Sequence, residues 1–164
     1  MSDYLIVVVN RASARFFTLE PVEFPELESG PRMVAHKELD NSEITDYPEM
    51  VTDSKTGRGA APRGGSVHGY DDKRDQHLDE LRRRFAVKVL EQIRRLAKAE
   101  GARTVILAAS SRIRRFLYPD VELLERQGIH VQKLSKNMIN FTPQKIHAHL
   151  AAEGLVPQKK RISV

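Results

Sequence analysis

A glycine-rich segment between residues 57 and 74 holds the side chains best placed to act on a ligand. It mixes glycines with cationic and hydroxyl residues, and its candidate nucleic-acid-binding residues are Arg58, Arg63, Gly64, Gly65, Ser66, His68, Lys73 and Arg74. Glycine lets a backbone approach a ligand closely, and lysine and arginine pair with phosphate groups. The segment therefore predicts an anion-binding loop, with a solvated flexible loop as the alternative.

The same segment raises the question of catalysis. In an extended loop, side chains two positions apart point to the same side, so Ser66 and His68 would be close enough to form a nucleophile–base pair. The spacing of the neighbouring residues supplies no acid that would orient such a histidine. A hydrolytic role for Ser66 stays open at this point, although a binding role needs fewer groups.

Other chemistries lack the residues they need. The chain has no cysteine, which excludes disulfides, thiolate metal sites and cysteine nucleophiles. It has neither a phosphate-binding P-loop nor a dinucleotide fingerprint, so no nucleotide cofactor is expected. The expected central strands at 4–9 and 104–109 carry no carboxylate, which argues against a two-metal nuclease.

The histidines do not form a metal-binding pattern along the sequence. His147 and His149 stand two apart on an expected helix and therefore point to different faces. His68 and His77 enclose three aspartates, but acidic residues at a helix start are explained by the helix dipole. We expect no metal site and no cofactor.

Hydrophobic periodicity predicts the elements that position these residues. Strands are expected at 4–9, 14–19, 32–39, 104–109 and 129–134, and helices at 71–99, 111–118, 121–127 and 143–152. The order β-β-β-α-β-α-β-α predicts one three-layer α/β domain over residues 1–154, a mixed sheet with helices on both faces, ribonuclease-H-like in its element order. A glycine-rich loop at 41–70, mobile over 53–70, and a basic C-terminal tail at 155–164, mobile over 158–161, complete the expected organisation.

The charge is divided unevenly along the chain. Residues 1–57 carry 5 Lys/Arg and 11 Asp/Glu, a net of −6, whereas residues 58–164 carry 22 and 11, a net of +11. A basic half of this kind predicts a polyanionic partner such as a nucleic acid, with an ordinary solvated surface as the alternative. No secretory signal or membrane-length apolar run is visible, so we expect a cytoplasmic protein with no membrane partner.

Four groups of motifs resemble one bacterial family. They are an N-R-x-x-A-R turn at 10–15, an S-D-x-x-G-R-like loop at 52–58, an R-F-A triplet at 84–86, and, over 105–150, a closing strand, a K-D-L-like segment at 133–138 and a final helix. In this order they are similar to the host attachment proteins, "protein required for attachment to host cells". That family has also been grouped with the middle domain of archaeal and eukaryotic peptide-chain release factors.

The resemblance implies a release-factor-like fold with a G-G-Q loop before a long basic helix. Here Arg63-Gly64-Gly65-Ser66 stands in that place, and Ser66 replaces the glutamine. A serine hydroxyl reaches less far than a glutamine amide, so the departure argues against peptidyl-tRNA hydrolysis. Asn137 likewise stands where the family has an aspartate.

The resulting hypothesis is a non-catalytic protein that binds RNA or the ribosome through the basic loop and helix. Two alternatives remain, a residual ester hydrolase acting on aminoacyl- or peptidyl-tRNA and an adaptor in surface attachment. The sequence leaves the oligomeric state open.

Overall fold

A computed structural model of the chain describes the backbone of residues 2–45 and 65–160, and the side chains of residues 2–43 and 73–160. The strands are β1 (Tyr4–Val9), β2 (Ser13–Glu20), β3 (Arg32–Ala35), β4 (Leu39–Asp40), β5 (Thr104–Ala109) and β6 (His130–Leu134). The helices are α1 (Ser42–Thr45), α3 (Gly65–Glu100), α4 (Ser111–Leu117), the short 3-10 helix η2 (Tyr118–Asp120), α5 (Val121–Arg126) and α6 (Pro143–Ala152). The predicted α/β class is confirmed.

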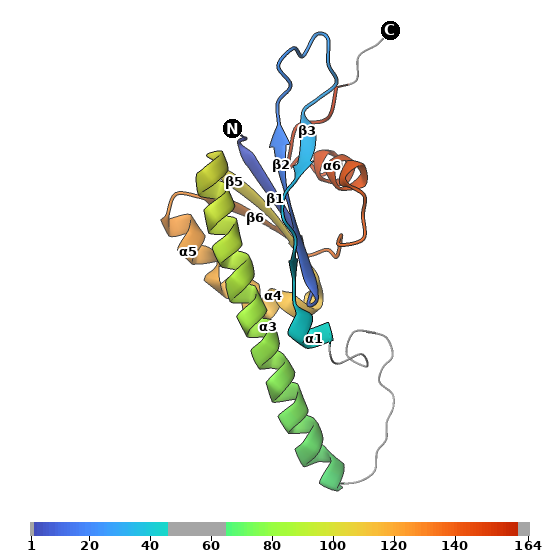
Figure 1. Cartoon of the computed structure of the whole chain (residues 1–164), viewed down its shortest axis with the longest axis vertical. Coiled ribbons are helices and arrows are strands. Elements are labelled where there is room, and N and C mark those ends of the chain that lie inside the picture. The colour runs from blue at the N-terminus through green and yellow to red at the C-terminus, as the bar shows by residue number, and fades with distance from the viewer. Residues whose placement is uncertain (1, 46–64, 161–164) are drawn as a thin grey trace.

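The strands form one open mixed sheet in the order β3-β2-β1-β5-β6, with β4 also beside β2 (Figure 1). β1 is antiparallel to β2 and parallel to β5, and β5 is parallel to β6. The last residues of β1, β5 and β6 therefore lie along one edge of the sheet, called here the carboxyl edge. In open α/β sheets, ligands bind beyond this edge.

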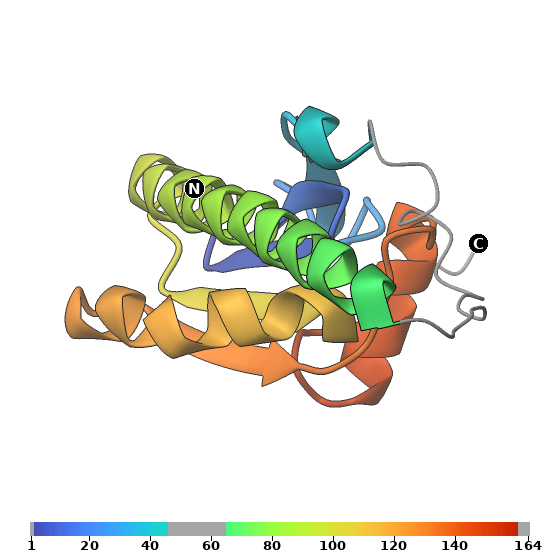
Figure 2. The same ribbon diagram turned by 90° about the horizontal axis from the view of Figure 1, so that it is seen from below.

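Helices cover both faces of the sheet, as the sequence predicts (Figures 1 and 2). Alternate residues of a strand point to opposite faces, which is why the unbroken apolar runs of β1 and β5 are buried on both sides. Leu5, Val7 and Val9 pack with residues of α3, α4 and α5. Ile6 and Val8 pack with residues of α6 on the other face.

α3 is the longest element, and it begins six residues before the start predicted at Asp71. Gly65 and Gly69 suggested a loop, but glycine costs a helix only about 1 kcal/mol against about 3 kcal/mol for proline, and the last proline of the segment is Pro62. The predicted loop at 41–70 is therefore too long at its C-terminal end, and α1 occupies part of its start. The mobility predicted for residues 53–70 falls mainly on 53–64, outside the described residues.

Within the described residues, no helix is both long and apolar enough to cross a bilayer.

The third predicted strand is divided into β3 and β4. Ala35 pairs with Phe17 and Leu39 pairs with Ala14, so three residues on one strand face two on β2. One extra residue of this kind is a β-bulge, which interrupts the ladder and bends the strand. His36 lies in the bulge, where its backbone N–H donates to the carbonyl oxygen of Phe16 at 2.8 Å.

The predicted mobile tail is attached to the domain as far as Lys160. Val156 is buried in the core under α6. The ring Nε2 of His147 donates to the carbonyl oxygen of Pro157 at 2.8 Å. Gly30 and Lys160 exchange two backbone hydrogen bonds of 3.2 and 2.9 Å. The polar composition of the tail did not reveal this pairing because backbone bonds do not depend on side-chain type.

The starts of α4 and α6 agree with the predicted ranges. Thr142 precedes α6, and its hydroxyl oxygen accepts from the backbone N–H of Lys145 at 3.1 Å. Ser110 occupies the corresponding position before α4, but its side chain makes no capping hydrogen bond. Of these two helices, α6 is therefore the one with a side-chain cap.

Candidate functional site

The eight residues selected from the sequence fall into three groups. Outside the described residues lie Arg58, Arg63 and Gly64. In the first turns of α3, with only their backbone described, lie Gly65, Ser66 and His68. Lys73 is exposed and Arg74 is half-buried, and both lie further along the same helix. The five described residues therefore all lie on α3, the helix that projects past the carboxyl edge (Figure 1).

The expected Ser66–His68 pair depended on an extended backbone. Residues 66 and 68 lie in α3 instead. The period-2 geometry that would bring residues two positions apart to one side belongs to extended chains, not to helices. The structural premise for this nucleophile–base pair is therefore wrong.

Two sets of cations lie beside aromatic residues at the carboxyl edge. Arg83 and Arg115 lie against Phe116, whereas Lys133 and Arg114 lie near Tyr118. We call the six residues together the basic-aromatic face. Its members come from α3, α4, η2 and β6. α4 follows β5 directly at the end of the parallel strands, where the backbone N–H of Ser110 donates to the carbonyl oxygen of Val9, and α3 lies beside α4 (Figure 2).

Phe116 lies between two arginines of this face. The guanidinium carbon of Arg83 is 5.4 Å from the ring centroid, and that of Arg115 is 4.6 Å away. The two side chains nevertheless keep 57% and 66% of their surface exposed. A cation over an aromatic ring is stabilised electrostatically and loses freedom. The pair is therefore held in place and still accessible to a ligand.

Tyr118 organises the other side of the face. Its hydroxyl donates to the carbonyl oxygen of Leu134 at 3.1 Å, which ties η2 to the end of β6. The ammonium nitrogen of Lys133 lies 5.4 Å from the centre of its ring. Burial raises the pKa of Tyr118, while hydrogen bonds to Ser135 and Ala109 and the charge of Arg114 act in the opposite direction.

This pKa shift predicts a pH dependence of stability. The folded state keeps the Tyr118 proton to higher pH than the unfolded state, so the free energy of unfolding falls as the pH rises above the ordinary tyrosine pKa of about 10. Tyr118→Phe should reduce that fall, because phenylalanine has no proton to lose at this position. Urea unfolding between about pH 9 and pH 11 measures the slopes. Equal slopes for wild type and Tyr118→Phe would refute the assignment.

Asp79 of α3 binds both an exposed arginine of the face and a buried arginine of its own helix. Its two carboxylate oxygens accept from Arg82 at 2.8 Å and from Arg115 at 2.6 Å. Arg82 is 8% exposed, and its Nε has no hydrogen-bond partner among the described residues. A buried guanidinium needs such a carboxylate, since an unpaired buried charge is costly. Asp79 thus fixes Arg115 at the surface and neutralises the positive charge of the buried Arg82.

A pocket of about 420 Å³ opens within this region. It is lined by Asp79, Arg83, Arg115, Phe116, Pro119 and Asp120. A larger hollow of about 460 Å³ lies between β3 and α6, but its lining is mainly alanine, proline and amide side chains. His147 is part of that lining, and its Nε2 is already used by Pro157. Of these two hollows, the one at the basic-aromatic face combines an acid–base pair with an aromatic ring, whereas the other has the cations Arg32 and Lys159 but no aromatic ring.

The sequence contained a signal for this face that was not recognised. Residues 111–118 read S-R-I-R-R-F-L-Y, with three arginines, two aromatics and no acid. The segment was assigned only as a short helix. The contribution of Arg83 was not visible because it depends on how α3 crosses α4.

Comparison with known proteins gives a family. A family model described as "Protein required for attachment to host cells" matches residues 5–150. The match covers β1 through most of α6 and therefore includes the whole basic-aromatic face. No curated protein matches the chain.

Proposed function

The chain belongs to the family of proteins required for attachment to host cells, and within that family we propose that it is a non-catalytic protein that binds structured RNA. The observation that carries the proposal is the basic-aromatic face. It places four cations and two aromatic rings at the edge of the sheet where open α/β folds bind their ligands.

The chemistry of the face suits a nucleic acid with exposed bases. Arginine forks pair with phosphates, and bases stack on aromatic rings or on guanidinium planes. Arg115, held over Phe116, offers both kinds of contact. Unstacked bases occur in the loops and bulges of structured RNA, including ribosomal RNA, which is why RNA is favoured over duplex DNA.

The charge of the surrounding chain supports the same partner. Residues 58–164 carry a net charge of +11, and α4 contributes three arginines without a single acid. Such a field attracts a polyanion from a distance, and the arginines then position it. The predicted cations Lys73 and Arg74 on the first half of α3 would extend the contact.

A binding role is favoured over hydrolysis by what lies at the carboxyl edge. Within the described residues, neither Ser110 nor Ser111 hydrogen-bonds a histidine. A serine needs an adjacent base to become a nucleophile. We therefore expect the face to hold RNA without cleaving it.

Crosslinking in living cells, followed by recovery of RNA, tests the proposal. We expect RNA to be recovered with the wild-type protein and at least tenfold less with a variant in which the four cations of the face are replaced by glutamine. Recovery of no RNA above the level of an uncrosslinked sample would refute the proposal and favour an adaptor that contacts other proteins.

The absence of release-factor activity is a separate prediction. Purified protein should not cleave peptidyl-tRNA above the background rate, because the glycine-rich segment has Ser66 where the G-G-Q loop has glutamine. Ser66→Ala should behave like the wild type in the same assay. Turnover that disappears in Ser66→Ala would instead establish the residual hydrolase.

A further inference from the structure

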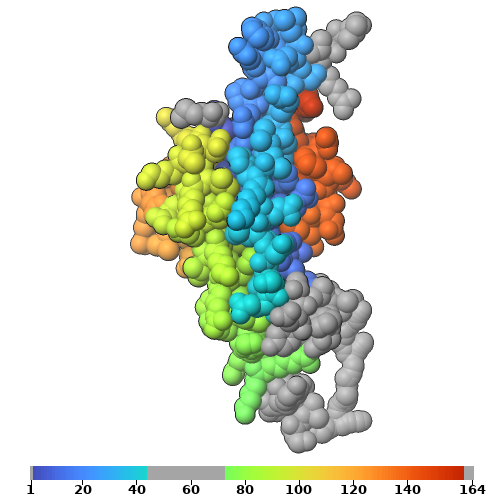
Figure 3. Space-filling model, in the orientation of Figure 1, coloured from blue at the N-terminus to red at the C-terminus, as the bar shows by residue number. Residues whose placement is uncertain are grey.

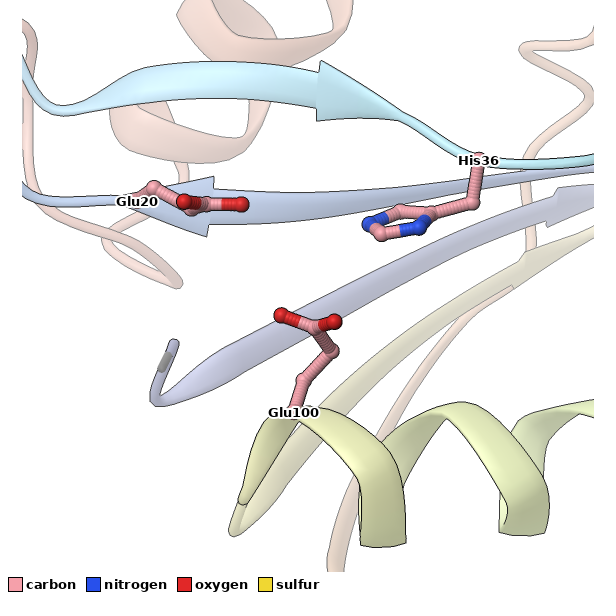
Figure 4. A group of neighbouring side chains, drawn as sticks. All are labelled: Glu20, His36 and Glu100. Carbon is pink, nitrogen blue, oxygen red and sulfur yellow. The ribbon is translucent and has the colours of Figure 1, made fainter.

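Three side chains from separate segments converge on the α3 side of the sheet (Figure 4). Glu20 ends β2, His36 lies in the bulge after β3, and Glu100 is the last residue of α3. One ligand atom of each lies within 4.8 Å of the other two. All three residues are half-buried, so the cluster is shielded but can be reached from solvent.

Thr18 orients the histidine of this cluster. Its side chain is completely buried, and its hydroxyl donates to a Glu20 carboxylate oxygen at 3.2 Å. The same hydroxyl oxygen lies 2.8 Å from Nε2 of His36. This contact fixes the orientation of the His36 ring beside the two carboxylates. Metal-binding histidines are commonly oriented by such a hydrogen bond from a neighbouring group.

Among the described residues, neither Glu20 nor Glu100 forms an ion pair with lysine or arginine. Glu100 also stands at the C-terminal end of a 36-residue helix, where the helix dipole favours cations and disfavours carboxylates. Two carboxylates at this position therefore favour a bound cation.

We propose that Glu20, His36 and Glu100 form a binding site for a divalent transition metal ion of the zinc class. An imidazole nitrogen with two carboxylates selects such ions, whereas magnesium and calcium prefer all-oxygen sites. Three protein ligands leave a fourth position open to water or a ligand. The ion joins the end of β2, the bulge and the end of α3, which lie side by side in Figure 3.

This site is separate from the basic-aromatic face. Glu20 and Glu100 lie near the first residues of β1 and β5, since Leu19 pairs with Tyr4 and Ala102, just after α3, precedes β5. The basic-aromatic face lies at the other end of the same strands. The metal-binding proposal can therefore be tested independently of the RNA-binding proposal.

Zinc titration of the full, untagged chain after removal of metals with a chelator tests the site. Calorimetry should show one ion bound per chain, and the melting temperature should rise on zinc addition, because an ion that binds only the folded state stabilises it. His36→Ala should abolish both effects. Thr18→Val, which removes the orienting hydroxyl at nearly constant volume, should weaken zinc binding by about 10- to 100-fold.

The control distinguishes this site from surface histidines that bind zinc weakly. His130→Ala removes an exposed histidine of β6 and should leave the zinc affinity unchanged. Glu100→Gln provides a second test that keeps the size of the side chain, with the circular dichroism spectrum reporting that the variant is folded. Absence of saturable zinc binding, or folded His36→Ala and Glu100→Gln variants that bind like the wild type, would overturn the proposal.

Discussion

Replacing the four cations of the basic-aromatic face with glutamine is expected to weaken RNA binding by about 100-fold at low salt. Hydrogen bonds to charged groups contribute about 1.5 kcal/mol or more each. Loss of only two of the four contacts would therefore account for that factor. Glutamine keeps a polar side chain with hydrogen-bonding groups but removes the positive charge, so the variant tests charge. Fluorescence anisotropy with a labelled structured RNA measures the affinity.

The salt dependence of the same titrations identifies the type of contact. Each cation that neutralises a phosphate contributes about 0.7 to 0.9 to the slope of log affinity against log salt. The slope of the variant should therefore be shallower by about three, and the loss should be similar for RNAs of different sequence. An unchanged slope together with a lower affinity would show that the four residues do not contact phosphates.

A matched variant controls for net charge. Arg94, Arg95, Lys98 and Arg103 are exposed cations at the other end of α3 and the start of β5. Their replacement with glutamine removes the same charge, so we expect a less than about threefold loss of affinity, as for remote surface charge screened by salt. Equal losses in both variants would indicate non-specific attraction and contradict the assignment of the face.

The glycine-rich segment selected from the sequence can be tested in the same assay. Neutralising Arg58, Arg63, Lys73 and Arg74 together should also weaken binding about uniformly across RNA sequences. Comparison with the face variant then shows which set of cations carries more of the affinity. A loop variant that binds like the wild type would restrict the interface to the carboxyl edge.

Local patterns in the sequence predicted most of the fold. The apolar run at 4–9 could only be a strand buried on both faces, and the stripe along α3 has one apolar residue per turn. Thr142 and Pro143 gave the start of α6 because capping is a property of adjacent residues. Errors occurred where glycine was interpreted as a loop, at Gly65 and Gly69, and where one bulge residue divided a strand.

Local sequence patterns could not predict contacts between segments that are distant in the chain. Arg15 donates to the carbonyl oxygens of Ile139 and Phe141 at 3.0 and 2.7 Å, more than 120 positions along the chain. The guanidinium of Arg15 also lies 3.9 Å from the carboxylate of Glu38, an acid of the same N-terminal half. The cluster of Glu20, His36 and Glu100 was missed for the same reason, since it exists only after α3 has returned along the sheet.

Phe85→Ala should cost about 3 to 5 kcal/mol of unfolding free energy, the usual range for deleting a buried aromatic ring. Phe85 is 2% exposed and lies in the core cluster that joins α3 to β1, β2 and β5. The ring fills space that alanine leaves empty, and the surrounding strands are too constrained to close the cavity. Urea unfolding followed by circular dichroism measures the loss.

Two further variants separate the cavity from a change in helix propensity. Phe85→Leu keeps most of the apolar volume and should cost less than Phe85→Ala. Val87→Ala lies on the exposed side of the same helix, where Val87 is 57% exposed, and alanine is the better helix former, so its effect should be within about 0.5 kcal/mol of zero. If Phe85→Ala were as mild as Val87→Ala, α3 would not be anchored through this ring. α3 supplies Arg83 to the basic-aromatic face. We therefore expect Phe85→Ala to weaken RNA binding under conditions in which α3 detaches from the sheet. Under conditions in which the variant is fully folded, its RNA affinity should equal that of the wild type.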